Sequence, residues 1–223
     1  MSARFATVTR GHYPTIATLF VAFLLLSNIG ATKLIEFDVG PLNLVFDGGA
    51  ILFPLTYILG DVLSEVYGFK AARKVILLGF VVSILASLTF YLVQIAPPAA
   101  DYENQAAFEA VLGFVPRIVA ASICGYLVGQ LINAWVLVAL KERYGEKNLW
   151  VRLMGSTVAG EAVDTVVFCI VAWAGVMGWA TIWNLMIVGF AYKVAVEAIL
   201  LPVTYRVVGY MKRTEPTYEE LRA

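Results

Sequence analysis

The chain has 223 residues, of which 61% are hydrophobic and only 14% are charged, with equal numbers of basic and acidic side chains. A soluble domain is about half apolar and a quarter charged, so this composition excludes an ordinary water-soluble protein and indicates an integral membrane protein. Basic residues are not interleaved with aromatics in any run, which argues against nucleic acid as a partner. The sequence contains no phosphate-binding glycine loop and no metal-ligand spacing, so we expect no cofactor and no metal.

Six segments are long and apolar enough to cross a membrane, which takes about 20 helical residues. In chain order they are Pro14–Ile35, Gly48–Tyr67, Lys74–Ile95, Val115–Leu140, Gly155–Val176 and Ile182–Val208. The first segment has the basic start of a signal peptide, but five further spans favour an uncleaved helix. The connections are short, so we expect one all-α domain, residues 1–223, that forms a bundle of six transmembrane helices.

Lysine and arginine are distributed unequally between the two sides of this bundle. The even-numbered connections and both ends carry most of them: Arg4, Arg10, Lys70, Arg73, Lys74, Lys141, Arg143, Lys147, Arg152, Lys212, Arg213 and Arg222. The alternate connections are mainly acidic. Because cytoplasmic loops carry the positive excess, the N- and C-termini are predicted to be cytoplasmic in a multi-pass protein of the cell inner membrane.

Two groups of three spans with opposite orientation fit the inverted-repeat plan of many transporters. The pairs Gly60-Asp61 and Gly160-Glu161 look alike. An inverted repeat would place equivalent residues at opposite depths, however, and these lie at the same depth. We interpret the similarity as shared site chemistry, and whether the bundle consists of 3+3 inverted halves stays open.

Ionisable side chains inside the spans predict a polar binding site. A charge at the bilayer centre costs at least about 2.5–3.5 kcal/mol, and such residues usually face the bundle interior. The six are spaced three or four residues apart in pairs, so each pair shares one helix face; they are Asp61, Glu65, Glu161, Asp164, Lys193 and Glu197. For Glu65 a second interpretation is that it reaches cytoplasmic water or pairs with Lys70 or Arg73.

The depths of these residues agree. Asp61 and Glu161 both lie about six residues from the cytoplasmic end of their spans, or roughly 10 Å inside the boundary. Gln130 and Asn133 lie at a similar level. Five acids face one lysine, so we expect Lys193 to pair with Glu197 or with an acid of the second or fifth span. The remaining acids suit a proton or a cationic, hydrogen-bond-donating ligand.

Two small-residue patterns concern packing. Residues 121, 125, 129 and 133 form a stripe on one helix face, which is typical of close helix contact. Packing within the bundle is the favoured interpretation, and a homodimer contact is the alternative. Gly48, Gly49 and Pro54 are predicted to break the start of the second span, either exposing backbone groups to the cavity or forming a kink without a role.

The residues that carry the chemistry also carry a family resemblance. Ser27-Asn28-Ile29, Phe46-Asp47-Gly48-Gly49 and the block from Pro54 to Arg73 resemble the queuosine precursor transporters, also called vitamin uptake transporters. The resemblance continues, over nearly the whole chain, through Asn133, Arg152, Ser156, Asp164, Phe168 and Lys193.

This resemblance implies import of 7-deazaguanine bases, the 7-cyano and 7-aminomethyl precursors of the tRNA nucleoside queuosine. One carboxylate can accept from the adjacent N–H and NH₂ of a guanine-like edge, and aromatic rings stack on such bases. The predicted stacking residues are Tyr57, Tyr67, Phe168 and Tyr192. The predicted substrate-binding residues are Asn28, Tyr57, Asp61, Glu65, Gln130, Asn133, Glu161, Asp164, Lys193 and Glu197.

A self-sufficient secondary transporter in contact with membrane lipid is therefore the leading interpretation. The alternative is a substrate-binding subunit of an ATP-driven vitamin or nucleobase importer. Such subunits commonly dock their partner through small residues four apart on the first helix. Here Ala17 is followed by Val21, and Ala22 by Leu26, so that pattern is missing. An intramembrane enzyme is disfavoured because no nucleophile with a positioned base is recognisable.

Overall fold

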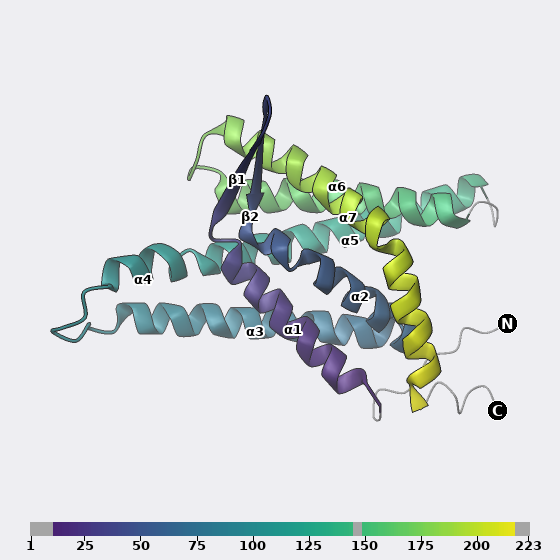
Figure 1. Cartoon of the computed structure of the whole chain (residues 1–223), viewed down its shortest axis with the longest axis horizontal. Helices are drawn as coiled ribbons and strands as arrows, with labels where there is room; N and C mark the ends of the chain where they lie inside the picture. Colours follow the sequence, from purple (N-terminus) through teal and green to yellow (C-terminus); the bar gives the residue numbers. More distant parts are fainter. Residues whose placement is uncertain (1–10, 145–148, 217–223) are drawn as a thin grey trace.

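The computed structural model describes residues 11–144 and 149–216, with side chains described at all of these except 130, 134, 137, 138, 141–144 and 149–153. Within these ranges the chain is mainly helical (Figure 1). Five helical segments are long and apolar enough to cross a membrane. They correspond to α1 (Tyr13–Gly30), α3 (Phe69–Ile95), α5 (Val115–Tyr144), α6 (Leu149–Trp173) and α7 (Trp179–Thr214). The predicted helical membrane fold is thus confirmed.

The second predicted span is shorter than expected. A 3-10 helix, η1 (Gly48–Ile51), comes first, and α2 covers only Phe53–Tyr67. Its 15 residues rise about 22 Å, less than the roughly 30 Å of a hydrocarbon core. The Asp47 side chain accepts from the Gly49 N–H at 2.9 Å and so caps η1, while Pro54 occupies the first turn of α2. The predicted break at the start of this span is therefore present.

A β-hairpin that the sequence analysis did not predict connects α1 to η1. Strand β1 (Leu34–Val39) pairs antiparallel with β2 (Leu42–Asp47), and Val39 lies opposite Leu42. Gly40 adopts a φ of 61° at the first position of the two-residue turn, where glycine is favoured. The expectation that the first span runs to Ile35 was wrong, because α1 ends at Gly30 and the following residues alternate apolar and acidic side chains.

Two groups of buried side chains hold the bundle together. One joins α1, α2, α3 and the last turns of α7, with Leu63 and Val66 fully buried at its centre. The other joins α5, α6, the first turns of α7 and Val45 of β2. The short helix α4 (Gln105–Leu112) lies before α5 and has no buried residue. α7 therefore contacts both halves of the molecule.

The small-residue stripe of α5 packs against α6 within the bundle. A Cβ added at Gly129 would lie 3.0 Å from the Gly160 carbonyl oxygen and 2.9 Å from the Cβ of Asp164. Gly160 in turn lies directly against Gly129 and Asn133. Only glycine permits this approach of two helix backbones. The favoured interpretation, packing inside one bundle, accounts for the stripe.

The end of α7 meets the start of α1. The Glu215 side chain is fully buried, and its carboxylate accepts from the Tyr67 hydroxyl at 2.6 Å and from the backbone N–H of His12 at 3.0 Å. Nearby, Lys212 forms an ion pair with Glu65. These contacts join α7 to α1 and α2 at the end of the bundle opposite the hairpin.

Candidate functional site

A cavity of about 780 Å³ lies between the helices and is bounded by both polar and aromatic side chains. Its wall is formed by α1, the β2–η1 segment, α2, α3, α5, α6 and α7. Seven of the predicted site residues line it: Asn28, Tyr57, Asp61, Asn133, Glu161, Asp164 and Lys193. This volume lies within the range of small-molecule sites.

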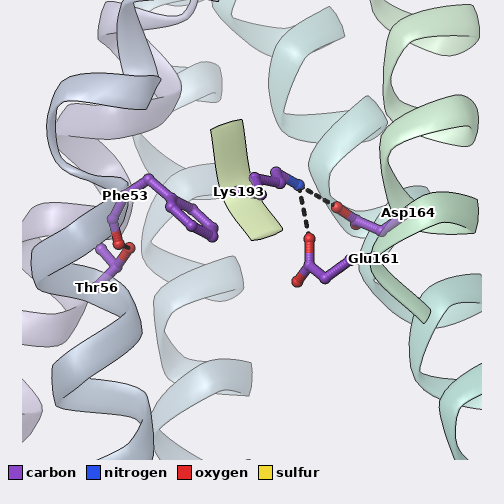
Figure 2. Close-up of polar contacts among 5 residues, drawn as sticks. All are labelled: Phe53, Thr56, Glu161, Asp164 and Lys193. Atoms are coloured by element: carbon purple, nitrogen blue, oxygen red, sulfur yellow. Dashed lines mark hydrogen bonds and ion pairs between the residues drawn. The ribbon is translucent and has the colours of Figure 1, made fainter. Parts of the chain in front are cut away.

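Lys193 forms the centre of the charged part of this cavity (Figure 2). Its Nζ donates to Asp164 Oδ2 at 2.6 Å and forms an ion pair with Glu161 Oε2 at 3.1 Å. All three side chains are about one-quarter exposed. The expected partner of Lys193 is therefore an acid of the fifth predicted span, and Asp164 is the stronger of two.

The glycines of α5 explain how Asp164 reaches this position. A Cβ added at Gly125 would lie 2.8 Å from Asp164 Oδ1, and one added at Gly129 would meet the Asp164 Cβ. The α5 backbone thus passes directly behind Asp164 and leaves its carboxylate directed at Lys193. Larger residues at these positions would displace the carboxylate.

The α2 wall lies opposite these acids and is aromatic and acidic. The Phe53 ring centroid is 5.5 Å from Lys193 Nζ, which is a cation–π distance. Tyr57 lies one turn further along and is close to the Glu197 carboxylate of α7. Asp61 follows on the same face and lines the cavity. Glu197 itself is 4% exposed and lies behind Tyr57, outside the cavity wall.

Asp47, an acidic residue of the connection between the first two predicted spans, also belongs to the cavity. It lines the wall at the junction of β2 and η1, close enough to Lys193 for their charges to interact. Burial raises the pKa of the Asp47 carboxyl, and the Lys193 charge and the Gly49 N–H partly offset this effect. The signal in the sequence was its place in Phe46-Asp47-Gly48-Gly49, next to glycines that bring backbone close to the site.

Two amides complete the wall. Asn28 of α1 is 5% exposed, and its Nδ2 donates weakly to Ser83 Oγ of α3 at 3.4 Å. The Oδ1 of Asn133 is buried and has no hydrogen-bond partner within the described part of the chain. A ligand that donates a hydrogen bond would satisfy this oxygen.

Other predicted residues lie elsewhere. Glu65 is outside the cavity wall and pairs with Lys212, rather than with Lys70 or Arg73. Tyr67 is buried against Glu215, so it is not available for stacking. The side chains of Gln130 and Arg152 lie outside the described residues. Phe168 and Tyr192 line the cavity as predicted.

The arrangement suits a flat, polar ring. Carboxylates on two sides can accept N–H groups, the Lys193 ammonium can donate to a carbonyl oxygen, and aromatic rings face the space between. Within residues 11–144 and 149–216, no three histidine, cysteine or acidic side chains are grouped to hold a metal ion.

Comparison with known proteins identifies the family of the chain. A profile described as "Putative vitamin uptake transporter" matches residues 47–207. The chain belongs to this transporter family. The family and the membrane-spanning helices confirm the prediction that the protein is a multi-pass membrane transporter and not an enzyme.

Three relatives are similar over much of this transporter. It is 34% identical over 161 residues to a probable queuosine precursor transporter of Bacillus subtilis (strain 168), covering 70% of this chain and 69% of the relative. It is 30% identical over 124 residues to one of Haemophilus influenzae (56% and 50%) and 27% identical over 150 residues to the queuosine precursor transporter of Escherichia coli K12 (67% and 65%). No solved structure matches the chain.

Proposed function

We propose that this transporter imports queuosine precursors, the 7-deazaguanine bases 7-cyano-7-deazaguanine and 7-aminomethyl-7-deazaguanine, as a self-sufficient secondary transporter. One observation carries the proposal: a lysine flanked by two carboxylates inside a membrane cavity, in a chain whose relatives are named for queuosine precursor transport. The substrates are flat, donor-rich rings, and the cavity presents acceptors and aromatic faces.

The chemistry of the site supports this substrate class. A deazaguanine ring presents N–H and NH₂ donors on one edge, and a carboxylate such as Asp61 or Glu161 accepts such a pair. The ring carbonyl accepts a hydrogen bond from an ammonium group, which suits Lys193. Phe53, Tyr57 and Tyr192 offer faces for stacking. An aminomethyl group is cationic and suits the surplus of acids over lysine in the wall.

The test is uptake of labelled bases by cells that lack their own import route. The chain should confer uptake, and Asp61→Asn should abolish it while leaving the protein in the membrane. Glu65→Gln is the matched control, because Glu65 lies one turn away on α2 but outside the cavity. Equal uptake by Asp61→Asn and the unchanged chain would refute the site assignment.

The purified chain in liposomes separates the two modes of transport. A secondary transporter should accumulate the bases without ATP or any other protein, and a proton uncoupler then reports whether protons drive the flux. Binding without flux by the purified chain would instead support a substrate-binding subunit.

A further inference from the structure

The β-hairpin and η1 form one end of the cavity. Phe46, Asp47, Gly49 and Ala50 all line it, so this segment is part of the wall rather than a remote loop. At the other end the lining includes Ser64, Phe69 and Arg73 near the α2–α3 junction, and these three side chains are exposed. The lining is therefore buried or partly buried at the hairpin end, whereas at the opposite end it includes side chains that are exposed to solvent.

Asn184 of α7 binds the backbone of β2 at Asn43 and Val45, beside the buried Val45 side chain that packs against the first turns of α7. The Val45 N–H donates to Asn184 Oδ1 at 3.1 Å, and Asn184 Nδ2 donates to the Asn43 carbonyl at 2.7 Å. An amide that both accepts from and donates to one strand fixes that strand in one register. Two turns further along α7, the Tyr192 hydroxyl donates to the Ala50 carbonyl at 2.9 Å.

The outer part of the hairpin makes few contacts. Leu42 at the turn is 61% exposed, and Figure 1 shows the strands projecting from the bundle beside α7. The root is different: Gly48 packs on the Gly30 carbonyl, too close for a Cβ, and its N–H donates to the Lys33 carbonyl at 2.8 Å. The root is therefore anchored on the end of α1, and the strands beyond it can pivot about this anchor when their contacts with α7 are released.

The wall of the cavity and the hairpin meet at one place. The Phe46 ring lies edge-on to Tyr192, with centroids 5.3 Å apart, and the next residue along α7 is Lys193. Asp47 lies on the strand next to Phe46 and interacts with the Lys193 charge. Movement of β2 therefore changes the surroundings of Lys193, which pairs with both Glu161 and Asp164.

We propose that the hairpin is a gate at this end of the cavity that pivots about its root, and that Asn184 is the latch that holds it closed. Opening separates β2 from α7, breaks the two amide hydrogen bonds and exposes the cavity on the hairpin side. Closing restores them and leaves the α2–α3 end as the exit. The positive-inside distribution puts the hairpin outside the cell, so the gate admits substrate there. This inference rests on the proposed import function for its direction of transport.

A reversible cross-link tests the gate. In a background with Cys124→Ala and Cys169→Ala, the pair Val45→Cys and Asn184→Cys is joined by a short bifunctional thiol reagent that a reductant cleaves. We expect uptake of the labelled bases to fall at least tenfold on joining and to recover on reduction. Undiminished uptake by fully joined protein would overturn the gate.

The matched control ties the hairpin to itself. Phe37 and Leu44 are opposite one another in the strand register, so Phe37→Cys with Leu44→Cys joins β1 to β2 without touching α7. A gate that moves as one body should still transport when this pair is joined. Equal inhibition by both cross-links would overturn the pivoting movement.

A second measurement does not depend on the substrate. Ser122 lines the cavity on α5, and Ser122→Cys in the same background reports access of a membrane-impermeant thiol reagent added outside cells. Adding Asn184→Ala should raise its labelling rate severalfold, and the Val45–Asn184 cross-link should slow labelling to the background rate. An unchanged rate in both would overturn the gate. If no form of the protein takes up the bases, the proposed function fails and the labelling rates alone decide the gate.

Discussion

Replacing Lys193 by methionine removes the positive charge between Glu161 and Asp164 and keeps much of the side-chain volume. At 2.6 and 3.1 Å, each pair has a Coulomb attraction of roughly 5–6 kcal/mol at an effective dielectric constant of about 20. Most of that attraction offsets the desolvation of the charges, and breaking a buried pair typically costs about 3–5 kcal/mol because a charge is stranded. We therefore expect Lys193→Met to lose about that much stability, seen as a lower thermal midpoint in detergent and a lower folded yield.

The loss of stability in Lys193→Met alone does not distinguish a structural role of Lys193 from a role in transport. The triple variant Lys193→Met, Glu161→Gln, Asp164→Asn removes the stranded charges while preserving shape. Its thermal midpoint should return close to that of the unchanged protein, since no unpaired charge remains in the site. Uptake of deazaguanine bases should stay at background, because the acceptors and the donor of the cavity are gone.

The combined result discriminates the two roles. Recovery of both folding and uptake in the triple variant would show that these three residues serve only as a structural ion pair, and would refute the proposed site. The double variant Lys193→Met, Glu197→Gln is a control, since Glu197 lies outside the cavity wall and the ion pairs of Lys193 are with Glu161 and Asp164. That double variant should remain as unstable as Lys193→Met alone.

Three further changes test the packing and topology. Gly129→Val should lower the free energy of unfolding by about 1–3 kcal/mol, because it overpacks the α5–α6 contact. Gly178 has open space around it, so Gly178→Ala should leave the thermal midpoint unchanged. Equal thermal midpoints for the two variants would contradict the close contact. Tyr67→Phe removes the hydroxyl that donates to the buried Glu215 carboxylate, so we expect the free energy of unfolding to fall by about 1–3 kcal/mol in the same thermal melt. An unchanged midpoint would mean that this hydrogen bond is not formed. Reporter fusions after Lys74 should report the cytoplasm and fusions near Glu103 the outside, and a cytoplasmic signal at Glu103 would overturn the topology.

Hydropathy predicted the long helices well because each contains a long run of mostly apolar residues. The predicted span Lys74–Ile95 ends where α3 ends, and Val115–Leu140 begins where α5 begins. The same criterion failed at residues 31–52, where an apolar run continues past Gly30 into a strand. Alternation of apolar and acidic residues, followed by Gly40-Pro41, was the local signal for the hairpin.

The site was predictable in type but not in pairing. The cost of a charge in the membrane indicated that Asp61, Glu161 and Asp164 face the interior, and all three line the cavity. Glu65 obeys the same rule of helix face yet pairs with Lys212, a residue 147 positions away in the chain. Such a partner depends on where the end of α7 lies, which helix periodicity does not specify.

The contact between the two ends of the chain bears on how the protein is made. Helices α1, α2 and α3 leave the ribosome before α7, but their shared core is completed by Val208 and Met211 of α7. Until then the face of α2 that later meets α7, Glu65 included, has only lipid, water or an assembly factor beside it. Premature release before Val208 would leave that face permanently uncovered, so quality-control proteases of the membrane should recognise shortened chains of this transporter far more readily than the full-length protein.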